Sequence, residues 1–549
     1  MLAVAAAIVL RETRGTTIWF DEWSWALERR GGGASSFLEP HNEHLSLVPV
    51  ALYKLLFATT GLDDYTPYRL MLVVAELGCA ALLFAYASRR IGPLAAIVPT
   101  ALLLFLGPAW QNLLWPFQVA WFLSLGAGVG ALLLLDRRDR RGDIGAAALL
   151  GLSLASSGLG VPIAIGLVLE LLLTRRRAWI LAAPIALYAL WWLSYRPAGL
   201  IRHNIGLAPG FAADAAAGAV GALSGLASSP IGDQGDALAW GRPLAVAAVA
   251  VLAWVLARRG TLPPRVLALL AMAVSFWVLT GLRRAELIRP DESRYLYAGA
   301  LFVLLIAVEL ARGAVLSRRA TALVAAVALV IVVANVGDLR DGARFVRTQS
   351  AITRADLGAL ELARPLVAPR RVLSRLPGYP FLTVEAGEYF AAARAIGSPA
   401  NSPAELATAP EAARVEADAE LAGIHAVAPR PSATDPPLGD RPAVDAPAPA
   451  LRETRSCVQL RLPAAGPVTA APELRLPVPP AGLLVTAGDA PVDVSVRRFA
   501  AGFPAAAQGT IAAGSSATLR IGADRARLPW HVRLVSRAAV RACALRTAP

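Results

Sequence analysis

Residues 68–88 read YRLMLVVAELGCAALLFAYAS and are followed at once by the arginine pair Arg89-Arg90. A membrane-spanning helix needs about 20 predominantly apolar residues, so this stretch predicts one. Further apolar runs cover residues 1–10, 92–109, 115–135, 144–158, 160–173, 178–195, 240–257, 265–282, 295–312 and 320–336. With 56% hydrophobic residues and a mean hydropathy of +0.54, the chain of 549 residues is too apolar for a soluble protein. The sequence therefore predicts a polytopic α-helical membrane protein.

The basic clusters between these runs determine the predicted topology. Loops on the cytoplasmic side of a membrane carry an excess of Lys and Arg, and the clusters are Arg89-Arg90, Arg137 to Arg141, Arg175 to Arg177, Arg258-Arg259 and Arg318-Arg319. All five lie inside if the chain crosses at every run and residues 144–173 form two short helices that turn back at 156–162. About eleven crossings result, with the N-terminus inside, although the run 1–10 is too short to span on its own. Because the clusters supply much of the net charge of +14, that charge does not indicate a nucleic-acid partner.

The composition divides the chain into three regions. Residues 1–336 form the predicted transmembrane domain, and its first outer loop covers 11–67. Residues 337–450 mix helical patterns with a Pro-rich stretch at 426–450 that we expect to be extended. Residues 451–549 contain short alternating segments divided by Gly, Pro and Asp, which is typical of a small β-sandwich or jelly roll. In the predicted topology both later regions are extracytoplasmic.

Two cysteines bracket the predicted β domain. Cys457 and Cys543 lie near its two ends, and a disulfide between them suits a domain that faces an oxidising compartment. Two free cysteines in unrelated strands are the alternative.

Polar side chains gather in the first outer loop. Asp21 and Glu22 follow the first apolar run directly, and two adjacent carboxylates beside lipid indicate a site. A second polar cluster, His41-Asn42-Glu43-His44, comes twenty residues later. Residues 45–57 then carry apolar side chains on a helical period with Lys54 among them, which predicts an amphipathic helix along the outer surface.

These features together resemble the GT-C superfamily of integral-membrane glycosyltransferases, which use polyprenyl-phosphate sugars as donors. The resemblance covers residues 15–336 and rests on the acidic pair, the number of crossings, the outer helix and the C-terminal domain. Three stretches resemble an actinobacterial group of that type: PHNEHLSLVP at 40–49, GPAWQNLLWPFQ at 107–118 and SRYLY at 293–297. The resemblance implies that Asp21 or Glu22 is the catalytic carboxylate. It also implies a basic residue that holds the donor phosphate, for which Lys54, Arg69 and Arg294 are the candidates.

Each candidate also has a structural interpretation. Asp21 and Glu22 could be a helix N-cap with its first-turn acid, and Arg294 and Tyr295 could be interfacial anchors. Lys54 could extend to lipid headgroups. His41, Asn42, Glu43 and His44 suit acceptor binding, or a divalent cation, which is the one cofactor indicated. Among the acids within apolar runs, Glu170 and Glu309 are expected to be structural, whereas Glu76 has no such explanation.

The sequence thus predicts an enzyme of the plasma membrane that moves a sugar from a polyprenyl-phosphate donor to an envelope glycan, lipid or protein at the outer face. The expected mechanism is inverting, and the expected partners are the donor, the acceptor and membrane lipids. The alternatives are an envelope lipid or polysaccharide transporter or flippase, or a non-catalytic anchor for a carbohydrate-binding β domain. A transporter favours repeated broken helices, and an anchor has no need for the acids of the first loop.

Overall fold

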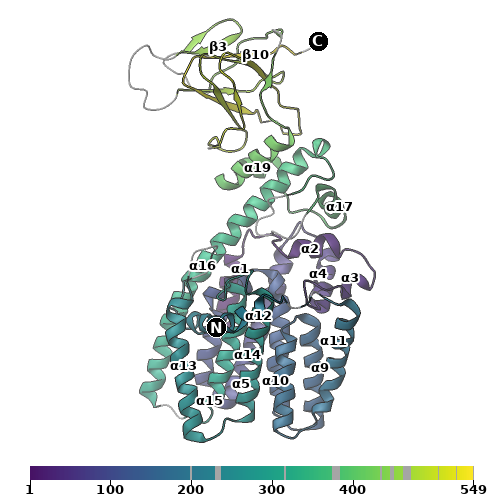
Figure 1. The fold of residues 1–549 in the computed structure, drawn as a ribbon, viewed down its shortest axis with the longest axis vertical. Coiled ribbons are helices and arrows are strands. Elements are labelled where there is room, and N and C mark those ends of the chain that lie inside the picture. The colour runs from purple at the N-terminus through teal and green to yellow at the C-terminus, as the bar shows by residue number, and fades with distance from the viewer. Residues whose placement is uncertain are drawn as a thin grey trace. The chain divides into compact units, whose positions relative to one another are not determined.

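The computed structural model describes the whole chain except residues 198, 200, 229–230, 232–235, 315–316, 374–383, 433–435, 446–450, 462–471, 505, 527 and 548–549. Its described part separates into two compact units, Met1–Arg347 and Thr348–Pro549 (Figure 1). The predicted Pro-rich stretch 426–450 falls partly outside the described residues.

Long helices make up most of the first unit. They are α1 (Leu2–Glu12), α5 (Thr66–Ile91), α6 (Pro93–Leu104), α8 (Val119–Leu135), α9 (Arg140–Ser156), α10 (Gly160–Leu173), α11 (Ala182–Tyr195), α12 (Asn204–Ala222), α13 (Leu238–Arg259), α14 (Pro264–Arg284), α15 (Ser293–Leu310) and α16 (Arg318–Leu362), which continues into the second unit. Shorter helices are α2 (Glu22–Glu28), α3 (Ser35–Leu38), α4 (Leu47–Thr59) and α7 (Trp110–Leu114). In Figure 1, α2, α3 and α4 gather at one end of α9, α10 and α11.

Within the described residues, eight helices are long and apolar enough to cross a membrane, or nine if a bent pair counts as one span. The prediction of a polytopic helical membrane protein is therefore confirmed. Three of the predicted runs form shorter helices, since α1, α9 and α10 contain 11, 17 and 14 residues. The run 92–109 is also interrupted: α6 ends at Leu104, and the chain bends by 46° before α7.

A buried ion network ties together one end of these helices, which we call the charged end. Arg90 at the end of α5 pairs with Glu309 near the end of α15 and, at 3.2 Å, with Asp136 after α8. Arg265 at the start of α14 bonds to Asp136 and, at 2.7 Å, to Glu170 of α10. Buried charges are tolerated only when they are paired. Glu170 and Glu309 therefore have a structural role, which is to pair with buried arginines. The helix ends that the network joins also bring the predicted basic clusters to one end of the bundle.

Helices α9 and α10 form the predicted hairpin. The chain breaks between them at residues 157–159, and Arg176 after α10 pairs with Asp143 at the start of α9. Arg176 also donates to the Leu135 carbonyl at 2.7 Å. The start of α9 and the end of α10 therefore lie at the charged end, and the junction between the two helices lies at the opposite end.

Residues 196–239 lie between two of the predicted apolar runs, and helix α12 occupies the middle of this segment. Asn204 at its start donates to the Leu282 carbonyl in the last turn of α14, at 3.4 Å. At its other end, the Ala222 carbonyl accepts from Asn335 of α16, and Gly221 approaches Ala237 at the start of α13. Both ends of α12 therefore lie away from the charged end, so α12 does not carry the chain across the bundle. Its many Ala and Gly residues allow this close packing.

The second unit contains α17 (Ala386–Ile396), α18 (Pro403–Thr408), α19 (Glu411–Ile424) and two antiparallel sheets. One sheet has the order β1-β8-β5-β10-β3-β2, with strands Arg430–Pro431, Ser516–Leu519, Leu483–Ala487, Val540–Ala544, Cys457–Leu460 and Leu451–Glu453. The other has the order β4-β9-β6-β7, with strands Glu473–Pro477, His531–Ser536, Val492–Arg497 and Gly509–Ile511. The predicted C-terminal β region is confirmed. Cys457 and Cys543 are opposite each other in β3 and β10, and a disulfide joins them.

Candidate active site

The backbone turns sharply where the acidic pair begins. Phe20 has a φ of 52°, in the left-handed region that residues other than Gly rarely adopt. Its ring packs edge-on against Trp115 at 5.7 Å, which holds this conformation. Strained backbone of this kind is concentrated at functional sites, and here it orients Asp21, the next residue.

Asp21 lies between a histidine and an arginine. Its carboxylate is 3.8 Å from His41 Nε2 and 3.7 Å from Arg294 Nη1, and only 4% of the residue is exposed. Asp21 occupies the N-cap position of α2, but its side chain makes no capping hydrogen bond. The capping interpretation therefore does not account for its carboxylate.

Glu22 has a different environment from Asp21. It is fully buried, and its carboxylate accepts hydrogen bonds from Tyr65 Oη at 2.7 Å, Trp115 Nε1 at 3.0 Å, Trp19 N at 2.9 Å and the Tyr53 hydroxyl. Burial raises the pKa of Glu22 to about 7, and these hydrogen bonds only partly oppose the shift. Glu22 thus connects α2, α4, the start of α5 and the Trp115 segment.

The His41–His44 cluster forms a tight turn. The backbone N–H groups of His41 and His44 each donate to the other's carbonyl, and Asn42 takes a φ of 54° between them. His41 is buried beside Ser24, with its ring 5.2 Å from that of Phe117. Burial lowers the pKa of His41 to about 3, and Arg29 adds to this effect, so the imidazole facing Asp21 is neutral. The turn then directs Glu43 and His44 away from Asp21.

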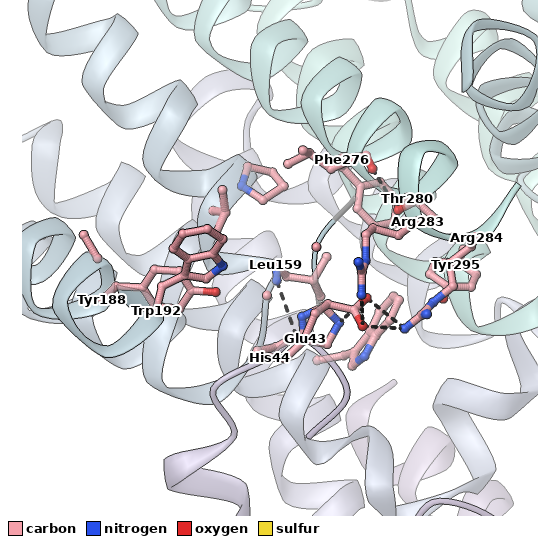
Figure 2. A pocket seen from close by; sticks show the side chains of 18 of the residues that line it. Glu43, His44, Leu159, Tyr188, Trp192, Phe276, Thr280, Arg283, Arg284 and Tyr295 are labelled. Carbon is pink, nitrogen blue, oxygen red and sulfur yellow. Dashed lines mark hydrogen bonds and ion pairs between the residues drawn. The ribbon is translucent and has the colours of Figure 1, made fainter. Parts of the chain in front are cut away.

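Glu43 and His44 line a cavity of about 540 Å³ (Figure 2). Its polar end is formed by Arg283 and Arg284 in the last turn of α14, which bind Glu43 at 3.2 Å and 2.8 Å. Burial raises the pKa of Glu43, but His44 and the two arginines outweigh it and hold the pKa at about 2. One ionised carboxylate thus holds two guanidinium groups at the mouth of the cavity, which leaves an excess of positive charge.

The other walls of this cavity are mainly apolar. Trp121, Val161, Pro162, Tyr188, Trp192 and Phe276 contribute to its walls. Val161, Tyr188 and Ala189 also line a second cavity of about 490 Å³, whose other lining residues are all aliphatic side chains of α9, α10 and α11. The two cavities therefore share a wall, with cations at one end and hydrocarbon surface along α10 and α11.

Other predicted site residues occupy varied positions. Tyr295 lines the cavity, and Arg294 beside it contacts Asp21, so these two residues connect the cavity with the acidic pair. Arg69 donates to Thr13 Oγ1 and to the Leu10 carbonyl, which caps the end of α1. Lys54 binds Ser36 Oγ at 2.6 Å and lies over the Phe37 ring. Arg69 and Lys54 are thus not in the cavity, and their contacts support the surrounding loops.

The cavity arginines were missing from the sequence-based candidates. Arg283 and Arg284 follow the run 265–282 on the side that the topology makes external, where few arginines are expected. An arginine pair against the positive-inside rule is therefore the signal that could have identified them. Among the described residues, no group of three or more His, Cys, Asp or Glu side chains is arranged to hold a metal ion.

No family model and no curated protein matches the sequence. Among solved structures, ArnT from Cupriavidus metallidurans bound to undecaprenyl phosphate is similar, with 12% identity and a TM-score of 0.44 over 73% of this chain and 84% of that one. Its apo form gives 13% identity and a TM-score of 0.41 over 67% and 80%. Arabinosyltransferase EmbB from Mycobacterium smegmatis gives 12% identity and a TM-score of 0.37 over 98% and 64%.

Proposed function

We propose that this protein is a GT-C-type glycosyltransferase that moves a sugar from a polyprenyl-phosphate donor to an envelope glycan, lipid or protein. The observation that carries this proposal is the cavity with Arg283 and Arg284 at one end and apolar walls along α10 and α11. A lipid-linked phosphate combines an anionic group, which suits the arginines, with a hydrocarbon chain, which suits the apolar walls. Arginine binds phosphate oxygens through paired hydrogen bonds, and the hydrocarbon chain requires an apolar surface.

Asp21 is the proposed general base. Its carboxylate lies beside Arg294, and Arg294 adjoins Tyr295 in the cavity wall. A carboxylate near the sugar can accept the proton of an acceptor hydroxyl as that hydroxyl attacks the anomeric carbon. Attack opposite the leaving phosphate inverts the configuration. Glu22 serves a positioning role in this mechanism, since tyrosine and tryptophan donors occupy its carboxylate.

The proposed location is the plasma membrane, with the cavity mouth on the outer side. Support comes from the charged end, which carries the basic residues and lies away from Asp21 and Glu43. Because cytoplasmic loops carry the excess of arginine, the opposite end is external. In this orientation the C-terminal unit is extracytoplasmic.

Binding of undecaprenyl phosphate to the purified full chain tests the donor site. Arg283→Gln removes one guanidinium but leaves Glu43 paired with Arg284, so the local fold should persist. Because charge-assisted hydrogen bonds contribute about 1.5–3 kcal/mol, we expect affinity to fall about tenfold or more. Arg242→Gln is the matched control, since Arg242 is 62% exposed on α13 and pairs with Asp214. Equal affinities for the wild type and Arg283→Gln would reject this donor site.

A further inference from the structure

Three arginines converge on one aromatic ring in the second unit. The guanidinium carbons of Arg497, Arg533 and Arg475 lie 4.9, 5.4 and 5.8 Å from the centre of the Phe503 ring. The arginines come from β6, β9 and β4, which are neighbours in the four-stranded sheet. We call these four residues the arginine cluster.

The strand register places like charges side by side in this cluster, which does not favour folding. Arg475 is directly opposite Arg533 in the β4–β9 pair, and like charges in that relation destabilise a sheet. Ser495 of β6 is opposite Arg533 on its other side, so Arg475, Arg533 and Ser495 form one row across the sheet, and Arg497 follows two residues after Ser495, opposite His531. On β4, β6 and β9, the alternate residues face inward and are buried, as with Leu474, Val494 and Val532. The row therefore occupies the other face.

Local carboxylates neutralise only part of this charge. Arg475 pairs with Glu473, and both side chains are more than a third exposed. Within the described part of the chain, no carboxylate lies within ion-pair distance of Arg497 or Arg533. His531, which is opposite Arg497 in the β6–β9 pair, hydrogen-bonds to Asp445 at 2.8 Å. The cluster thus has an excess of positive charge.

The arginines are held in place by backbone carbonyls. Arg497 donates to the Ala500 carbonyl at 2.6 Å, and Arg533 donates to the Pro504 carbonyl at 2.9 Å. Both acceptors belong to the segment that carries Phe503. The Nε atoms of Arg497 and Arg533 are buried without a protein acceptor, and unsatisfied buried donors are costly. The guanidinium groups are therefore ordered before any ligand binds, while part of their hydrogen-bonding capacity is unused.

We propose that the arginine cluster binds an oxyanion carried by a saccharide, such as the carboxylate of a uronic acid. A carboxylate matches the planar donors of arginine. Ser495 is buried, and its hydroxyl accepts from Arg533 Nη2 at 3.5 Å, which helps to position that guanidinium. The Phe503 ring offers an apolar surface beside these cations. This site lies in a different unit from the lipid cavity, so it is independent of the transferase proposal.

Calorimetric titration of the full-length protein with trigalacturonate tests the site, with uncharged maltotriose as the comparison sugar. We expect saturable binding of trigalacturonate alone, and Arg533→Gln should weaken it about tenfold or more. Arg452→Gln is the control, because Arg452 is an exposed arginine of β2 in the other sheet. Inorganic phosphate that competes would show that the cluster binds oxyanions generally, whereas phosphate without effect would restrict the site to carboxylates.

The thermal midpoint of Arg533→Gln provides a check on folding. The variant loses the hydrogen bond to the Pro504 carbonyl but also the repulsion between Arg533 and Arg475, so we expect a midpoint close to that of the wild type. Such a midpoint shows that weaker binding does not result from unfolding. Arg497→Gln gives a second variant from another strand. Absence of trigalacturonate binding, or equal binding by the wild type and both variants, would overturn the proposal.

Discussion

Asp21 and Glu22 are adjacent in the chain, but their surroundings give them different chemistry. Asp21 faces Arg294 and a neutral His41, with no capping bond to hold it in a structural role. Glu22 is enclosed by two tyrosines, a tryptophan and a backbone N–H. A carboxylate needs access to a proton donor on the substrate to act as a base, and this requirement favours Asp21.

The raised pKa of Glu22 predicts a specific pH dependence of stability. Folded Glu22 keeps its proton up to about pH 7, whereas a glutamate in the unfolded chain has a pKa of about 4.5. Between these values the folded state binds more protons, so stability falls as pH rises. Glu22→Gln removes this contribution, and the variant should gain thermal stability relative to the wild type from pH 5 to pH 8. Thermal unfolding curves that shift in parallel across this range would contradict the assignment.

At the scale of elements, the apolar runs predicted most helices because lipid-facing segments must be long and apolar. Each predicted run overlaps a helix of the structure, although the run 92–109 is interrupted after Leu104. Helix α12 was not predicted, because its Ala, Gly and Asp residues interrupt the apolar pattern. Its packing against α14 also depends on contacts between residues that are distant in sequence. The cavity could not be predicted from the sequence either, because Glu43 and Arg283 are far apart in the chain and only the fold brings them into contact.

The prediction for the second unit concerns the disulfide between strands β3 and β10. Cys457 and Cys543 are partners in register, and both are buried. We expect mass spectrometry of non-reduced peptides to find them linked in protein isolated from membranes. Reduction should lower the thermal stability of this unit, because a disulfide typically contributes about 2–4 kcal/mol. Alkylation of both thiols in the folded, unreduced protein would rule out the bond.

At the scale of the whole molecule, one end of the helical unit carries the paired arginines and acids, and the other carries Asp21 and the cavity. This polarity supports the proposed orientation in the membrane. A phosphatase that is active only outside the cytoplasm, fused after residue 549, should therefore be active. The same fusion placed after residue 260, next to Arg258-Arg259, should be inactive and is the control. The reverse pattern would place Asp21 on the cytoplasmic side.

The central claim is that Asp21 is the base of a sugar transfer from a polyprenyl-phosphate donor. The most direct measurement compares transfer by purified wild type and Asp21→Asn, using a panel of labelled polyprenyl-phosphate sugars and envelope extract as acceptor. Asn has nearly the same size and shape as Asp, and Asp21 makes no capping hydrogen bond that the change could remove, so folding and undecaprenyl phosphate affinity should remain. The amide cannot accept a proton, and we expect transfer to fall about 10²–10⁴-fold. Near-normal transfer by Asp21→Asn would contradict the claim.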